Sequence, residues 1–274
     1  MCTQTRWATV SLALMWLTLG LSSSSIAQTK LYDDFRSKRI DPSKWVGEKA
    51  SLAPGSDKDR REVSVGIVGE EEDRSLRISQ TNYSAITDNN GSSGIGFGLG
   101  FAKPSQLKAV SFTLSVDEVQ VVDCGSNPSF GTVGFFGDYF NPTGATNGQT
   151  GDIVASIGVT RFSRTGGLDV GGSVSQCQDA ECDGQTTLSF QDLGPVMAGR
   201  TNTLAAIWDQ NNHQFIFRLN NNPPIAVPYT VPDSFPPGNA DKSFFVFGDV
   251  PHCTTKPRPF ASITARFGDV YVNP

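Results

Sequence analysis

Hydrophobic residues occupy every second position along much of this chain. In the stretch 110–116, Val, Phe, Leu and Val alternate with Ser and Thr. The same alternation returns at 153–159, 204–208, 215–219 and 261–267, and in shorter form at 63–67, 76–78, 133–136, 168–170, 225–227 and 244–247. A period of two is what a strand with one buried face requires. Since no segment keeps a helical period, the sequence predicts an all-β protein.

Turn-forming residues separate these stretches. Examples are Asn89-Asn90-Gly91, Asn141-Pro142, Gly166-Gly167 and Pro236-Pro237-Gly238. The short polar link 209–213 between two apolar stretches predicts a hairpin. About ten or more strands without helices between them favour two packed antiparallel sheets, as in a jelly-roll sandwich. No repeat and no long linker divides the chain, so we expect one domain.

Composition and charge narrow the functional class. The 274 residues include 28 Gly and 16 Pro, which excludes a helical bundle. With 22 basic and 27 acidic residues the net charge is −5, and Lys and Arg form no cluster. Nucleic-acid binding depends on such clusters, so we expect no nucleic-acid partner.

The first 27 residues have the order of a secretory signal peptide. Arg6 precedes an apolar run over 7–21, and the small-residue triplet Ser25-Ile26-Ala27 follows. A membrane anchor is the alternative, but the run of about 15 residues is shorter than the roughly 20 that cross a bilayer. We expect cleavage after Ala27, a mature domain over 28–274, a secreted or periplasmic location, and no membrane span thereafter.

Four cysteines follow the predicted cleavage site, at positions 124, 177, 182 and 253. Four cysteines in an exported chain suggest two disulfides, and they can pair in three different ways. The short spacing of Cys177 and Cys182 favours a local loop, which leaves Cys124 to pair with Cys253. A zinc site is the alternative, and the absence of a C-x-x-C pair disfavours it.

Three segments resemble a known family. Leu31-Tyr32-Asp33-Asp34-Phe35 with Ile40 to Trp45, the hairpin residues 205–220, and the closing stretch 265–272 resemble exported bacterial concanavalin A-like lectin/glucanase domains. The resemblance implies a two-sheet antiparallel jelly-roll sandwich in which the first and last segments lie close together. Independently of the resemblance, Trp45 and Trp208 each lie in an apolar stretch of sequence, so we expect both in the core.

Catalytic motifs of that superfamily are absent. Its laminarinase-type glucanases carry Glu-x-Asp-x-x-Glu on one strand, which this sequence lacks. The nearest acidic cluster is Asp117, Glu118 and Asp123, where the alternation slips and a bulge could re-aim one carboxylate. His213 lies in the predicted hairpin and His252 beside a cysteine, so neither fits a general base. We therefore expect no enzyme, with an atypical hydrolase or lyase as the alternative.

Asp138, Asn141 and Asp152 are candidate ligands for a calcium ion. This region resembles the one where legume lectins place Asp, an aromatic residue, Asn and a second Asp around calcium, and oxygen ligands suit that ion. The spacing differs by one residue and the later metal-binding His is absent, which disfavours a transition metal. The default role for Asp138 is in forming a turn, with calcium binding as the alternative.

Aromatic residues are the expected sugar-binding groups. Tyr139 and Phe140 are the first candidates and Tyr83 the second, since a ring holds the apolar face of a pyranose. Glycines at 94, 96, 98 and 100 clear one strand face for either a ligand or a neighbouring backbone. The expected function is non-catalytic carbohydrate binding. A structural envelope protein is a further alternative, and the oligomeric state stays open.

Overall fold

The structure is a computed structural model that describes residues 29–49, 60–84, 91–144, 147–163, 165–254 and 258–273. The predicted signal peptide and its cleavage site lie outside these ranges. The described residues form strands and three short 3₁₀ turns, without an α-helix, which confirms the all-β prediction. No helix in this part of the chain is long and apolar enough to cross a membrane.

Sheet A is built from eight strands. In spatial order it contains β13 (Ile225–Pro228), β12 (Gln214–Leu219), β11 (Thr201–Asp209), β6 (Ala109–Val122), β15 (Phe260–Val272), β4 (Ser75–Tyr83) and β3 (Arg60–Val68), with β1 (Lys30–Asp33) also paired to β15. The predicted hairpin is β11 and β12, joined by a 3₁₀ turn over Gln210–Asn212.

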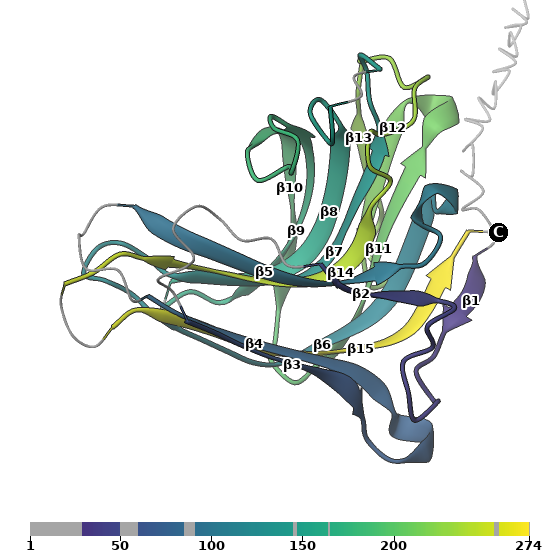
Figure 1. Cartoon of the computed structure of the whole chain (residues 1–274). Coiled ribbons are helices and arrows are strands. Elements are labelled where there is room, and N and C mark those ends of the chain that lie inside the picture. The colour runs from purple at the N-terminus through teal and green to yellow at the C-terminus, as the bar shows by residue number, and fades with distance from the viewer. Residues whose placement is uncertain are drawn as a thin grey trace, which may run out of the picture.

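Sheet B is built from seven strands. In spatial order it contains β10 (Gln185–Val196), β9 (Leu168–Cys177), β8 (Ile153–Phe162), β7 (Phe130–Phe140), β14 (Lys242–Pro251), β5 (Ser92–Phe101) and β2 (Trp45–Lys49). All strand pairs are antiparallel, which confirms the predicted sandwich. Both sheets bend the same way, and sheet B lies on the inside of the bend (Figure 1).

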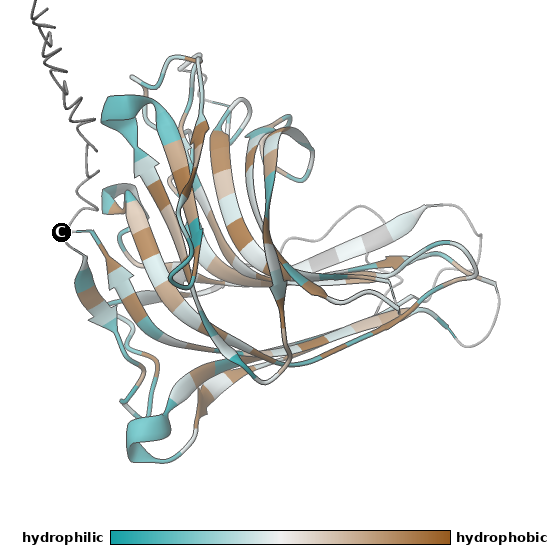
Figure 2. Cartoon of the chain, turned by 180° about the vertical axis from the view of Figure 1, so that it is seen from behind, coloured by the Kyte–Doolittle hydropathy of each residue, from teal (hydrophilic) through white to brown (hydrophobic). Residues whose placement is uncertain are grey.

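Phenyl rings fill the space between the sheets. Phe112 of sheet A lies 4.9 Å from Phe244 of sheet B, measured between ring centroids, and Phe244 stacks on Phe267 at 4.4 Å. Hydrophobic and polar segments alternate along the strands of both sheets in Figure 2. The side chains that alternation assigned to one face are therefore those that the sandwich buries.

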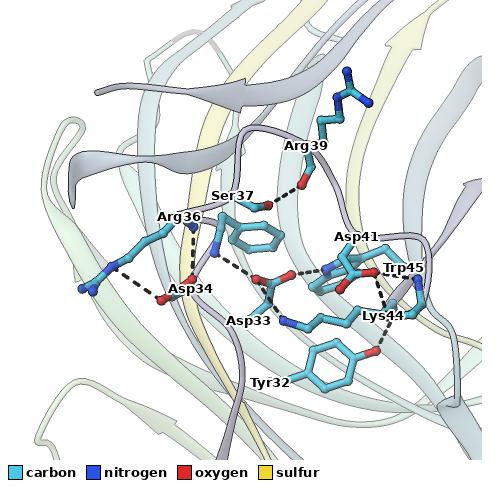
Figure 3. Close-up of polar contacts among 11 residues, drawn as sticks. Tyr32, Asp33, Asp34, Arg36, Ser37, Arg39, Asp41, Lys44 and Trp45 are labelled. Carbon is cyan, nitrogen blue, oxygen red and sulfur yellow. Dashed lines mark hydrogen bonds and ion pairs between the residues drawn. The ribbon is translucent and has the colours of Figure 1, made fainter. Parts of the chain in front are cut away.

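The first and last strands pair, as the sequence predicted. Leu31 of β1 lies opposite Tyr271 of β15. Asp33, at the end of β1, is buried. Its carboxylate accepts hydrogen bonds from Trp45 Nε1 at 2.7 Å and from the backbone N–H of Phe35 at 3.1 Å (Figure 3). Because Trp45 begins β2, this carboxylate joins the edge of sheet B to β1 of sheet A.

Both predicted disulfides are present. The Cα atoms of Cys124 and Cys253 are 5.9 Å apart, and those of Cys177 and Cys182 are 4.7 Å apart. The first bond joins the ends of β6 and β14 across 129 positions of sequence, and the second closes a loop at the end of β9. Because all four thiols are consumed, the alternative zinc site is excluded.

Candidate functional site

Tyr139 and Phe140 lie in the core, which corrects the prediction that they form a sugar platform. Their exposed fractions are 4% and 0%, and they pack 5.1 Å from Phe215 and 5.5 Å from Trp208, respectively. The register between β7 and β8 shifts between Asp138 and Phe140, so two consecutive rings point inward where strict alternation would expose one. Neither ring has a face open to a sugar.

Tyr83 is exposed, but it belongs to a different surface. It ends β4 on the outward side of sheet A, where its ring lies 6.2 Å from Phe260. The core residues of β4 alternate with it, so its side chain points away from sheet B. The three predicted aromatic residues therefore do not form one site.

The acidic cluster of the predicted alternative enzyme also belongs to sheet A. The register between β6 and β15 shifts at Asp117, so the bulge expected from the sequence is present. At the bulge, the carboxylate of Asp117 accepts a hydrogen bond from Arg266 Nε at 2.7 Å. Glu118 accepts one from the side-chain amide of Gln120, and Asp123 accepts the backbone N–H of Ser129. The three carboxylates are thus used within sheet A and its turn.

The residues of the predicted calcium site do come together. Asp138, Asn141 and Asp152 are all fully buried. Asn141 Nδ2 donates to Asp152 Oδ1 at 2.8 Å, and both oxygens of Asp152 accept the backbone N–H of Gly238 at 2.9 Å. The cluster therefore attaches the segment that precedes β14 to the turn between β7 and β8.

Asp138 has a cation beside it that the chain itself supplies. Its Oδ2 accepts from Gln149 Nε2 at 2.9 Å and from the backbone N–H of Asp241 at 3.0 Å. The ammonium of Lys242 donates to the main-chain carbonyl of Asp138. Burial raises the pKa of Asp138 to about 8, and burial likewise lowers the pKa of Lys242 to about 8.

These contacts do not fit a calcium ion. The amide of Asn141 is fixed, because its nitrogen donates to the carbonyl of Thr150 and its oxygen accepts the backbone N–H of Thr143. Both oxygens of Asp152 already accept N–H groups. Asp138 Oδ1 alone among these side-chain oxygens has no partner. One open oxygen falls short of the six to eight ligands that calcium takes.

A different surface presents aromatic rings. The core residues of sheet B alternate with outward-pointing ones, which together form what we call the free face of sheet B. The free face lies on the inside of the bend (Figure 1). It carries six phenyl rings, those of Phe130, Phe136, Phe162, Phe190, Phe245 and Phe247.

Two of these rings are open to solvent, and one of the two belongs to a row of three rings. Phe162 and Phe190 are 57% and 59% exposed. The ring of Phe130 lies 6.0 Å from that of Phe162 and 5.8 Å from that of Phe247. A row of rings at such distances offers several adjacent apolar surfaces to one extended ligand.

A row of glycines crosses the middle of the free face. Gly134, Gly158 and Gly171 lie opposite one another on β7, β8 and β9. A Cβ at Gly134 would lie 2.1 Å from the carbonyl oxygen of Ile157, so only glycine fits there. Adjacent strands are about 4.8 Å apart, so the row runs for about 10 Å, and the ring of Phe190 covers its Gly171 end.

Hydroxyl groups stand on both sides of the glycine row. Thr160 donates to Thr132 at 2.8 Å on one side, and Ser156 and Ser173 share a hydrogen bond of 2.8 Å on the other. Hydroxyl groups both donate and accept, as do the hydroxyls of a sugar. The free face therefore places rings and hydroxyls within one surface.

The glycines predicted to clear a strand face are partly covered. A Cβ at Gly94 would lie 2.4 Å from the ring of Phe247, and one at Gly96 would lie 3.3 Å from it. The sequence allowed either a ligand or a neighbouring backbone at this face. The structure places a side chain of β14, the Phe247 ring, over Gly94 and Gly96. This packing holds the Phe247 ring in place within the row.

Carboxylates on the free face are few and lie toward its ends. Asp249 is on β14 and Asp169 on β9, three strands apart, which separates them by at least about 14 Å. Glycosidases hold their two carboxylates about 5 to 10 Å apart. Asp169 and Asp192, at the outer edge of the face, are diagonal neighbours on β9 and β10, so their Cα atoms are about 8 Å apart. Both side chains are exposed.

No protein-family model and no curated protein matches this sequence. The structure is similar to solved structures with the concanavalin A-like lectin/glucanase fold, at low sequence identity. One is the carbohydrate recognition domain of Emp47p, at 12% identity and a TM-score of 0.35, covering 84% of this chain and 99% of that one.

Two glucanases are also similar. A glycoside hydrolase family 16 endo-glucanase from Bacteroides ovatus has 9% identity and a TM-score of 0.42, covering 86% of this chain and 98% of that one. The catalytic domain of an endo-1,3-beta-glucanase (laminarinase) from Thermotoga petrophila RKU-1 has 12% identity and a TM-score of 0.38, covering 90% and 99%. The sandwich itself rests on the strand pairing described above.

Proposed function

We propose that this chain is an exported, non-catalytic domain that binds a neutral glycan on the free face of sheet B. The observation that carries the proposal is the combination on that face of exposed phenyl rings, hydroxyl pairs and a glycine row. The order of charged, apolar and small residues in 1–27 and the two disulfides support export, since disulfides persist in oxidising compartments.

The chemistry of the face favours a neutral ligand. Phenyl rings cover the apolar side of a pyranose, while hydroxyls exchange hydrogen bonds with its rim. Among the described side chains of this face there is no Lys or Arg. A uronic acid or a sulfated sugar would find no cation to pair with its charge. We therefore expect a neutral polysaccharide.

Truncating an exposed ring should weaken glycan binding. Phe162→Ala and Phe190→Ala should each raise the dissociation constant about 5- to 150-fold, since a contact ring contributes about 1 to 3 kcal/mol. Both rings are more than half exposed, so the fold should be unaffected. Isothermal titration calorimetry with a neutral glucan oligosaccharide measures the change.

Tyr83→Ala is the matched control, because it removes an exposed ring from sheet A. Its dissociation constant should equal that of the unmodified protein. A loss of affinity in Tyr83→Ala with none in Phe162→Ala or Phe190→Ala would transfer the site to sheet A.

Cleavage is the second candidate function, and the placement of Asp169 and Asp192 favours it. The backbone positions of these two exposed residues are about 8 Å apart beside the glycine row, a spacing that lets their carboxyl groups lie within the glycosidase range. If the domain cleaves glycans there, incubation with a β-glucan should release reducing ends, and Asp169→Asn should abolish the release. Under the binding proposal, neither protein releases reducing ends above the buffer control.

A further inference from the structure

We infer that the ammonium of Lys242 takes the place of a metal ion in the cluster of Asp138, Asn141 and Asp152, so that this end of the sandwich holds together without calcium. The inference concerns the stability of the domain and is independent of the proposed glycan site.

Lys242 is enclosed where a cation would be needed. It begins β14 and is 2% exposed. Its Nζ donates to the main-chain carbonyl of Asp138 and lies 4.4 Å from the ring centroid of Tyr139, over the ring face. Its charge acts favourably on the carboxylates of Asp138 and Asp241. One buried cation thus binds a carbonyl and an aromatic face, and two carboxyl groups act on it electrostatically.

The neighbouring strand makes room for this side chain. Gly137 of β7 lies directly opposite Lys242. A Cβ at Gly137 would lie 2.7 Å from Lys242 Cγ, so any other residue there would collide with the side chain. The lysine is therefore built into the strand pairing and does not enter the cluster by chance from a loop.

The cluster holds a segment that crosses between the sheets. After β13 the chain leaves sheet A and enters sheet B at Lys242. Along this crossing, the carbonyl of Phe235 accepts the N–H of Asn141 at 3.2 Å, and the N–H of Gly238 binds Asp152. The carbonyl of Asp241 accepts the N–H of Asp138 at 2.7 Å. Buried carboxyl groups at such a junction are stabilised by these hydrogen bonds, and a nearby positive charge stabilises them further.

A divalent cation and Lys242 would compete for this place. Like charges a few ångströms apart in a buried site repel strongly. The hydrogen bonds that occupy Asn141 and both oxygens of Asp152 leave too few ligands to offset that repulsion. The ammonium already provides what calcium would provide here, which is positive charge beside Asp138.

The test compares melting temperatures in calcium and in chelator. The unmodified protein should melt at the same temperature in both, and calorimetric titration should show no calcium binding. Lys242→Met should lower the melting temperature by about 5 to 10 °C, because it leaves the buried carbonyl of Asp138 without its donor and removes the positive charge near the carboxyl groups of Asp138 and Asp241. Lys103→Met is the matched control, since Lys103 is exposed, and it should melt as the unmodified protein does.

A double variant separates the charge from the packing. If Lys242 acts through its charge, adding Asp138→Asn to Lys242→Met should restore part of the lost melting temperature. A calcium-dependent rise in the melting temperature of the unmodified protein would overturn the inference, even if Lys242→Met does not fold. An unchanged melting temperature in Lys242→Met would overturn it too.

Discussion

Replacing Cys124 and Cys253 by Ala should lower the free energy of unfolding by about 5 kcal/mol. The bond joins positions 129 residues apart, and the chain entropy that a crosslink removes from the unfolded state grows with the length of the closed loop. For a domain of this size the melting temperature should fall by about 10 to 20 °C. Chemical denaturation followed by intrinsic fluorescence measures the free energy.

The second disulfide provides the comparison. Cys177 and Cys182 are five positions apart, so replacing both by Ala should cost only about 2 kcal/mol. Equal losses for the two double variants would contradict an account in which loop length sets the contribution. An unaffected Cys124 and Cys253 variant would show that other contacts hold the ends of β6 and β14 together.

Asp33→Ala should lower the free energy of unfolding by about 4 kcal/mol. The substitution leaves the indole N–H of Trp45 and the backbone N–H of Phe35 without their acceptor, and each buried unsatisfied donor costs about 1 to 3 kcal/mol. The ammonium of Lys44, 3.5 Å from the same carboxylate, loses its partner as well (Figure 3). Urea denaturation measures the loss.

Adjacent Asp34 is the matched control for Asp33. Its carboxylate pairs with the exposed Arg36 at 3.5 Å, and such surface pairs contribute less than about 1 kcal/mol. Asp33→Asn, which keeps one acceptor oxygen, should fall between the two alanine variants. If Asp34→Ala cost as much as Asp33→Ala, the buried hydrogen bonds would not explain the effect.

Strict alternation predicted most of the strands because burial on one face leaves a period of two in the sequence. Alternation failed to predict strands that are not buried on one face. Strand β10 is an edge strand, mostly exposed, and its register shifts twice, so no period remains. Strand β5 alternates glycine with apolar residues, which showed a cleared face but not the Phe247 ring that covers part of it.

The candidate site was less predictable than the fold, for physical reasons. The rings of Tyr139 and Phe140, which we expected to bind a sugar, both lie in the core because the strand register shifts by one residue beside Tyr139. The sequence contains no signal that predicts a bulge at this position. Gly134, Gly158 and Gly171 align only through strand register, which distant parts of the chain decide together. The acidic and amide residues near Asp138 were grouped correctly, but the approach of Lys242 from β14 reverses their expected role.

The free face of sheet B could be recognised afterwards by a signal that the sequence does contain. Phe130, Phe162, Phe190, Phe245 and Phe247 all fall on the polar phase of their strands or at a strand end, where an apolar ring gains nothing from the core. Rings retained at outward positions of several neighbouring strands indicate a surface that meets a partner.

A glycan array with the mature chain tests the central claim most directly. It should compare the unmodified domain with the Phe162→Ala and Phe190→Ala double variant, in calcium and in chelator. We expect the unmodified domain to bind neutral glycans equally in both conditions, and the double variant to lose that binding. Binding that survives in the double variant, or binding to no neutral glycan, would contradict the account.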